Sequence, residues 1–193
     1  MDRNWTRRLV YLGLLTALAV IFTRFIVVTI AIGGVDNFRL GIGQLFLILA
    51  GILYGPLAGA YVGAMADIIG FVVRPGGPYV PLFTLTSMLT AILPGLLLTI
   101  MRRGRAGLPS LGQLMIAVAF GQIASPILLT SYFLQISFGH PFVVSLAPRL
   151  VTQAFFIPAF ALLAHLLLRR LSGIVPLWET VNPVKVSEPV RGS

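Results

Sequence analysis

The sequence contains no cysteine, 2 histidines and 5 acidic residues among its 193 positions. Without cysteine the chain forms no disulfide bond and no thiolate metal site, and two histidines are too few for the usual histidine-based metal centres. The sequence also lacks a nucleotide-binding loop of the transport-ATPase type, an HExxH helix, paired intramembrane carboxylates and a Ser/His/Asp grouping. We therefore expect that the protein is not an enzyme and has no catalytic residue, metal or cofactor of its own.

Charge is scarce as well, at 10% of the residues, whereas 58% are hydrophobic and the mean hydropathy is +0.98. This composition is too apolar for a soluble domain and indicates a protein that crosses the lipid bilayer several times. The formal net charge of +9 is compatible with nucleic-acid binding. Basic residues that flank membrane spans explain the charge more simply, so we expect no nucleic-acid partner.

The apolar runs predict an all-α membrane protein, a six-helix bundle in one domain at residues 1–171. A triplet, Ala17-Leu18-Ala19, resembles a signal-peptide cleavage site, but the apolar run continues through Phe22 and favours a first span. The polar segment 172–193 contains three prolines and is predicted to be a flexible cytoplasmic tail. The six predicted spans cover about residues 9–32, 39–54, 57–73, 80–101, 111–138 and 143–168.

Basic residues gather before the first span, between the fourth and fifth spans, and after the sixth. With six spans all three groups fall on one side of the membrane, which the positive-inside rule makes cytoplasmic. The sequence therefore predicts that both termini are cytoplasmic. The groups are Arg3, Arg7 and Arg8; Arg102, Arg103 and Arg105; and Arg169, Arg170, Lys185 and Arg191.

Four further arginines converge on the opposite, extracellular half. Intramembrane arginine is costly and usually faces the bundle interior or a water-filled cavity, although snorkelling to outer headgroups is an alternative. The acidic residues of this half are Asp36 and Asp67. The excess of positive charge predicts an anionic ligand. The four arginines, all candidate ligand contacts, are Arg24, Arg39, Arg74 and Arg149.

The segment 55–86 combines a glycine stripe, one carboxylate, a turn and an aromatic cluster. Glycine recurs at every fourth position and so lies on one helix face, where it favours packing inside the bundle. The next step of this period is Asp67, for which a structural ion pair and a ligand contact are both open. The aromatic side chains after the turn are suited to stacking on a flat ring, but they are also ordinary at a membrane interface. The stripe is Gly55, Gly59 and Gly63, and the cluster includes Tyr79, Phe83 and Thr86.

Other candidate ligand contacts lie later in the chain. Gln153 is one helical turn from Arg149 and shares its face, so it is placed either to bind a ligand or to satisfy a neighbouring helix. Thr130 and Tyr132 lie towards the outer end of the fifth span. In the first span Gly13 and Ala17 form a small-xxx-small pair, which permits a close approach between helices.

Several short motifs follow one another in a characteristic order. Arg-Leu-Gly at 39–41 opens the second span, and Gly-Pro at 55–56, Asp-Ile-Ile-Gly at 67–70 and Pro-Leu-Phe-Thr-Leu at 81–85 come after it. Phe-Gly-His-Pro-Phe at 138–142 later precedes Pro-Arg-Leu at 148–150. Over about residues 9–171 this succession resembles the vitamin-binding S components of energy-coupling factor (ECF) transporters, and the folate-specific family above all. That family usually has glycine at the position of Leu82 and Asn-Thr at the position of Thr130-Ser131.

The resemblance implies a subunit of the bacterial cytoplasmic membrane that captures folate at its extracellular face and does not hydrolyse ATP. It implies docking through Gly13 and Ala17 onto an ECF transmembrane subunit, which is driven by two ATPase subunits that use ATP. Folate carries a flat pterin ring and a glutamate tail with two carboxylates. Arginine binds carboxylates bidentately, and Asp67 is suited to accept hydrogen bonds from the pterin edge.

Two other hypotheses stay open at this point. One is an S component for another anionic vitamin or metabolite, since the arginine excess argues against a cationic ligand such as thiamin. The other is a small membrane enzyme or assembly factor that uses Asp67 as its reactive group. An S component should co-purify with its ligand and with the ATPase module, whereas an enzyme should turn over a substrate alone.

Overall fold

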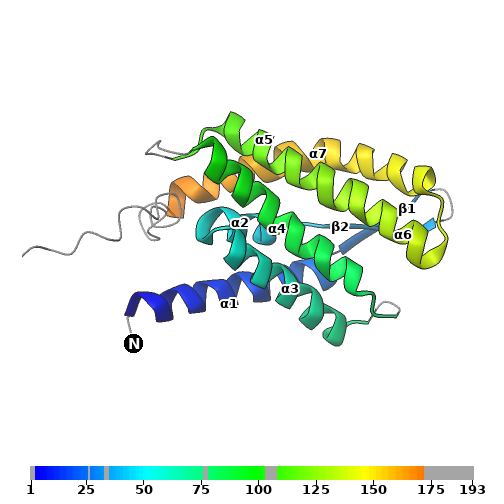
Figure 1. Ribbon diagram of the computed structural model, residues 1–193, viewed down its shortest axis with the longest axis horizontal. Coiled ribbons are helices and arrows are strands. Elements are labelled where there is room, and N and C mark those ends of the chain that lie inside the picture. The colour runs from blue at the N-terminus through cyan, green and yellow to red at the C-terminus, as the bar shows by residue number, and fades with distance from the viewer. Residues whose placement is uncertain (1–2, 26, 33–34, 76–77, 103–107, 172–193) are drawn as a thin grey trace, which may run out of the picture.

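The computed structural model describes residues 3–25, 27–32, 35–75, 78–102 and 108–171, and the predicted tail at 172–193 lies outside them. Over these ranges the chain forms six helical segments and one β-hairpin (Figure 1). The prediction of a six-helix bundle is therefore confirmed. The segments are α1 (Arg3–Arg24), α2 (Gly43–Tyr54), α3 (Pro56–Val73), α4 (Pro81–Met101), the continuous run of α5 (Leu111–Gln122), η1 (Ile123–Leu129) and α6 (Thr130–Phe138), and α7 (Phe142–Leu171).

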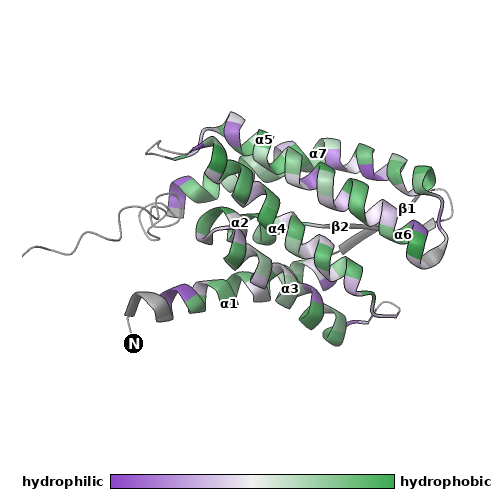
Figure 2. Ribbon diagram, in the orientation of Figure 1, coloured by the Kyte–Doolittle hydropathy of each residue, from purple (hydrophilic) through white to green (hydrophobic). Residues whose placement is uncertain are grey.

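Most of these segments have the length and composition of membrane spans. Hydrophobic residues cover most of the helices, and hydrophilic ones form bands near the start of α1 and the end of α7 (Figure 2). Helix α2 differs, because its 12 residues reach only about 18 Å at 1.5 Å per residue, short of a hydrocarbon core of about 30 Å. The five helices that are long enough are Thr6–Arg24, Pro56–Val73, Pro81–Met101, Leu111–Ser137 and Phe142–Arg170.

A β-hairpin occupies the residues predicted to end the first span and to begin the second. Helix α1 stops at Arg24, and β1 (Val27–Ile32) pairs antiparallel with β2 (Val35–Gly41) before α2 begins. The predictions of a first span reaching residue 32 and a second span opening at Arg39 are therefore wrong. The physical reason is the β-branched run of β1, which favours an extended chain, followed by a Gly-Gly pair of the kind that suits a hairpin turn. Arg39 lies on β2, opposite Thr29 of β1.

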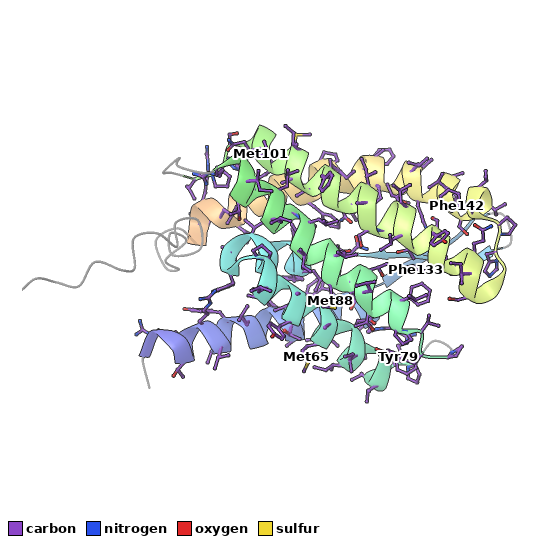
Figure 3. The ribbon with its side chains drawn as sticks, viewed as in Figure 1. Met65, Tyr79, Met88, Met101, Phe133 and Phe142 are labelled. Carbon is purple, nitrogen blue, oxygen red and sulfur yellow. The ribbon has the colours of Figure 1, made fainter. Side chains whose placement is uncertain are left out.

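The two ends of the bundle differ in character. The hairpin, the end of α3 and Tyr79 lie at one end, here called the hairpin end (Figures 1 and 3). At the opposite end α1 begins, α4 finishes at Met101 and α7 finishes. We call this the basic end, because Arg7, Arg8, Arg102, Arg169 and Arg170 all lie close to it along the chain.

The helices are arranged in layers. Figure 1 shows α1 and α3 on one side, α5 and α7 on the other, and α2 and α4 between them. Helix α4 contacts α2, α3 and α5, so it joins the two sides. One apolar cluster fills the space between α2, α5 and α7 around Ile48, Leu114 and Phe160, and a second lies between α1, α2 and α3.

Small residues bring α2, α3 and α4 into backbone contact. A Cβ atom on Gly51 would overlap the carbonyl oxygen of Ala91, and one on Gly95 would overlap the carbonyl oxygen of Gly51. A Cβ atom on Gly59 would lie 2.7 Å from Cα of Gly51. We call Gly51, Gly59, Ala91 and Gly95 the glycine node. No side chain larger than hydrogen fits at its three glycines without a shift of the backbone.

The predicted glycine stripe turns out to serve two purposes. Gly59 and Gly63 pack as expected, and a Cβ atom on Gly63 would lie 2.6 Å from the carbonyl oxygen of Ser87 in α4. Gly55 instead forms the corner between α2 and α3, where its φ of +90° favours glycine. Pro56 then occupies the first turn of α3, where no N–H donor is needed.

Candidate ligand-binding site

The central pair of the site joins two of the predicted residues. Nη2 of Arg24, the last residue of α1, lies 3.5 Å from Oδ1 of Asp67 in α3, and both side chains are largely buried, at 15% and 17% exposed. Gly70, one turn beyond Asp67, makes room for the guanidinium, because a Cβ atom there would lie 2.6 Å from Nε of Arg24. The sequence motif Asp-x-x-Gly thus supplies both the carboxylate and the space for its partner.

A chain of hydroxyls connects Asp67 to the start of α4. Oγ1 of Thr84 donates a hydrogen bond to Oδ2 of Asp67 at 2.7 Å, and the hydroxyl of Tyr79 lies 2.8 Å from the same Thr84 oxygen. Since Thr84 has one hydroxyl proton, Tyr79 donates to Thr84. The ring of Tyr79 also packs against Phe71, with centroids 5.1 Å apart. Tyr79 is therefore held in place at the rim of the site.

Arg74 closes the same cluster from the end of α3. Its Nη1 donates to the backbone carbonyl of Arg24 at 2.7 Å, and the rest of the side chain is exposed. This bond satisfies a carbonyl at the C-terminal end of α1, where intrahelical partners run out. Four of the residues predicted from the sequence, Arg24, Asp67, Arg74 and Tyr79, thus meet at the hairpin end.

A cavity of about 200 Å³ opens beside this pair. Its wall offers one acid, one guanidinium, one carboxamide, two hydroxyls and two apolar side chains, a mixture that suits a flat molecule with a polar edge. Ser87 belongs to the cluster that follows the turn in the segment singled out from the sequence. The other four residues were missed by sequence reasoning, although Gln44 carried a signal as a polar residue inside an apolar run. The lining residues are Thr23, Arg24, Gln44, Leu47, Ala66, Asp67 and Ser87.

The run from α5 to α6 is interrupted by a π-helical turn, η1, which contains Pro126. Oγ of Ser125 in this turn donates to the carbonyl oxygen of Thr86 at 2.6 Å, and Oγ1 of Thr90 lies 3.0 Å from Oγ of Ser125. Thr86 itself uses its hydroxyl to bond the carbonyl oxygen of Phe83, at 2.7 Å. These bonds attach η1 to α4, so the predicted residue Thr86 here connects helices.

Three other predicted residues also lie around η1. Nη1 of Arg149 donates to the carbonyl oxygen of Pro126 at 2.9 Å, which attaches α7 to η1. Oγ1 of Thr130 lies 3.4 Å from the carbonyl oxygen of Ser125. Oε1 of Gln153 is buried and accepts no hydrogen bond from the described part of the chain. None of the three lines the cavity beside Asp67.

The predicted aromatic residues separate into two settings. Phe83 is half-buried near the start of α4, whereas Tyr132 is 52% exposed on α6. The neighbour of Tyr132, Phe133, is the residue that turns inwards, with 9% exposed. Figure 3 shows Phe133 at the same end of the bundle as Tyr79. An aromatic residue of α6 therefore does face the interior, one position later than predicted.

The small pair of α1 lies away from the site. Ala17 is exposed, and a Cβ atom on Gly13 would have no heavy atom within 4 Å among the described residues. This contrasts with the glycine node and with Gly43, whose Cβ position is filled by Thr23. Gly13 is therefore not needed for packing within the described bundle.

Comparisons with known proteins agree on one class. Residues 3–172 match the model of a family described as "ECF-type riboflavin transporter, S component". The chain is 27% identical over 157 residues to the folate transporter FolT of Clostridium novyi (strain NT), which covers 81% of this chain and 85% of that one. Its fold is similar to a crystal structure of FolT bound with folic acid, with a TM-score of 0.66 and 21% identity over 83% of this chain and 90% of that chain. It is also similar to the S component for biotin from an ECF-type ABC transporter, with a TM-score of 0.70 and 20% identity over 90% and 95%.

Proposed function

The chain belongs to the family of ECF-type riboflavin transporter S components, and we propose that within this class it binds folate at the hairpin end. As a family member it is a transporter subunit rather than an enzyme, and it is a multi-pass protein of the cytoplasmic membrane. The alternatives of a membrane enzyme or an assembly factor are thereby set aside. What remains to be assigned is the ligand, the orientation and the partner subunits.

The observation that carries the folate assignment is the placement of Asp67 and Arg24 at a cavity of about 200 Å³. Drug-sized ligands fill pockets of about 300–1,000 Å³, so this cavity accommodates one end of a molecule as large as folate. The pterin edge carries N–H groups that can donate hydrogen bonds to a carboxylate, and a ring carbonyl that can accept a hydrogen bond from a donor. The similarity to the folate transporter FolT of Clostridium novyi, at 27% identity, supports the same ligand.

The glutamate tail of folate then extends towards the rim. Arg74 is exposed beside Arg24 and is placed to bind a tail carboxylate, in the bidentate manner that guanidinium groups favour. Arg39 follows on β2 as a second candidate. Arg149 contributes through the attachment of α7 to η1. Phe83 and Phe133 are the aromatic candidates for stacking on the ring or the benzoate linker.

Riboflavin is the second candidate, because the family description names it. Riboflavin is uncharged at neutral pH, so it gives the arginines no carboxylate partner. Biotin, the ligand named for the second structural relative, has one carboxylate but no aromatic ring. Folate provides a partner for both the acid and the arginines.

Titration of the purified, emptied protein with folate, riboflavin and biotin tests the assignment. We expect folate to bind with a dissociation constant below about 1 µM, equivalent to about −8.2 kcal/mol, and at least 100-fold more tightly than the other two vitamins. Intrinsic fluorescence quenching gives the affinities, and mass spectrometry of small molecules released from the freshly purified protein identifies the natural ligand. Failure of folate to bind at micromolar concentration, or tighter binding of riboflavin, contradicts the assignment.

The charge distribution supports a cytoplasmic basic end and an extracellular hairpin end. Helix α1 begins and α7 finishes at the basic end, near which Arg7, Arg8, Arg102, Arg169 and Arg170 lie along the chain, and such flanking residues favour the cytoplasmic side. The folate site then opens to the outside. Delivery to the cytoplasm requires an ECF transmembrane subunit and two ATPase subunits, which supply the ATP hydrolysis that this chain does not perform.

The exposed small pair on α1 is the proposed docking surface for the transmembrane subunit. Replacement of Gly13 by Leu places a large side chain on this surface and should lower folate uptake by cells severalfold, because small residues allow the close helix approach on which such docking depends. Folate affinity of the isolated subunit should not change. Gly112→Leu is the matched control, since Gly112 also has nothing within 4 Å but lies on α5. Equal uptake by the two variants argues against docking through α1.

A further inference from the structure

Two glutamines extend the polar wall of the cavity into the bundle. Gln44, in the first turn of α2, lines the cavity together with Arg24 and Asp67. Behind it, Nε2 of Gln122 in α5 donates a hydrogen bond to Oε1 of Gln44 at 3.1 Å. Gln122 is fully buried, at 0% exposed. The bond therefore connects the cavity wall to a polar group that lies entirely inside the protein.

A glutamine at position 122 is unfavourable for the stability of the fold. A buried amide group that lacks a hydrogen-bond partner costs about 1–3 kcal/mol, and Oε1 of Gln122 accepts no hydrogen bond from any described residue. Neighbouring buried positions of α5, such as Leu114 and Val118, are filled by apolar side chains. Leucine or methionine would fill this position equally well. The contribution that only glutamine makes here is the hydrogen bond to Gln44.

The bond determines which end of Gln44 is presented to a ligand. Because the oxygen of Gln44 is used by Gln122, the NH₂ group of Gln44 remains for the cavity, and it is a donor with two protons. Across the cavity, Asp67 offers carboxylate oxygens, which only accept. The wall thus presents acceptors on α3 and a donor on α2, in a fixed arrangement.

We infer that Gln44 is a specificity-determining residue that donates a hydrogen bond to the ring carbonyl of the ligand, and that Gln122 is the positioning residue that orients it. This inference rests on the proposed folate function. The pyrimidine edge of the pterin presents, in order, an amino group, a ring N–H and a carbonyl oxygen. Asp67 matches the two donors and Gln44 matches the acceptor.

The 4-amino analogue of folate tests this, because it replaces the ring carbonyl with an amino group and keeps the glutamate tail unchanged. The same change removes the proton of the adjacent ring nitrogen, which faces Asp67, so the effect that belongs to Gln44 is the change in preference between the wild type and the Gln44 variants. The wild-type protein should bind folate at least tenfold more tightly than the analogue. Gln44→Met should weaken folate binding about tenfold and analogue binding less than threefold, so that the preference nearly disappears. Gln122→Met should reduce the preference partly, because the amide of Gln44 can then rotate to present either end.

Gln135→Met is the matched control, since Gln135 is exposed on α6, and it should retain the wild-type preference. Gln44→Glu, which keeps the shape of the side chain but has no NH₂ group, covers the case in which Gln44→Met does not fold. If the role of Gln44 is purely structural, its variants should bind both ligands more weakly by the same factor. An unchanged preference in the Gln44 and Gln122 variants would overturn the inference. If the wild-type protein binds neither compound, the proposed folate function fails first and the inference fails with it.

Discussion

Replacement of Asp67 by asparagine should lower the affinity for folate at least 100-fold. The carboxylate is held by Arg24 at 3.5 Å and by Thr84 at 2.7 Å, so its oxygens point in defined directions at the cavity wall. Hydrogen bonds that involve a charged group contribute about 1.5–3 kcal/mol each, and the pterin edge offers two donors to this group. Asparagine replaces one acceptor oxygen by a donor and removes the negative charge that faces Arg24. Isothermal titration of the detergent-solubilised variant measures the loss.

A double variant separates ligand binding from the ion pair itself. Asp67→Asn also destabilises the fold, because removing one member of a largely buried ion pair takes away the charge that offsets the other. Arg24→Gln combined with Asp67→Asn should restore the melting temperature without restoring folate affinity. Thr84→Val removes the hydroxyl that donates to Asp67 and accepts from Tyr79, and it should cost about tenfold in affinity, since the carboxylate remains. Full recovery of binding in the double variant would show that the pair is structural.

Replacement of Gly51 by alanine should lower the melting temperature by roughly 6–12 °C. The added Cβ atom would overlap the carbonyl oxygen of Ala91, which is backbone and cannot rotate away as a flexible side chain could. Overpacking of a tight core costs about 3 kcal/mol or more in such a case, and each kcal/mol corresponds to about 2–4 °C for a chain of this length. Thermal unfolding monitored by the loss of monodisperse protein measures the effect.

Gly112→Ala is the matched control for this variant. Gly112 lies in the first turn of α5 with no heavy atom within 4 Å of its Cβ position among the described residues, so alanine there should leave the melting temperature unchanged or raise it slightly. Gly95→Ala, which meets the carbonyl oxygen of Gly51, should behave like Gly51→Ala. A melting temperature of Gly51→Ala within 2 °C of the control, about 1 kcal/mol or less, would mean that the glycine node separates easily.

The helices were predictable because the length of each apolar segment can be measured directly from the sequence. The segment 57–73 became α3 with a difference of one residue at its start, and the predicted span at 111–138 is the run from α5 to α6. The errors lie between residues 25 and 42, where hydropathy alone does not separate an apolar strand from a helix. The β-branched residues of β1 and the Gly-Gly pair after it carried the information that hydropathy omits.

The charged residues of the site were predictable from the sequence. Asp67 and Arg24 stand out in an apolar sequence, and the structure brings them together. Gln44 and Gln122 were not identified, because a single glutamine in a span is also compatible with ordinary helix contacts. Their 78-residue separation leaves no periodicity from which pairing can be read. Leu47 and Ala66 line the cavity through shape alone, which no sequence pattern predicts.

The position of the cavity in the chain has a consequence for biosynthesis. All the residues that line it, from Thr23 to Ser87, belong to α1, α2, α3 and α4. During synthesis the residues of these helices leave the ribosome before Gln122 does. Helices α2, α3 and α4 also share the glycine node, a packed interface that involves none of the later helices. The order of translation therefore places synthesis of the residues that line the ligand cavity ahead of the residue that tunes its selectivity.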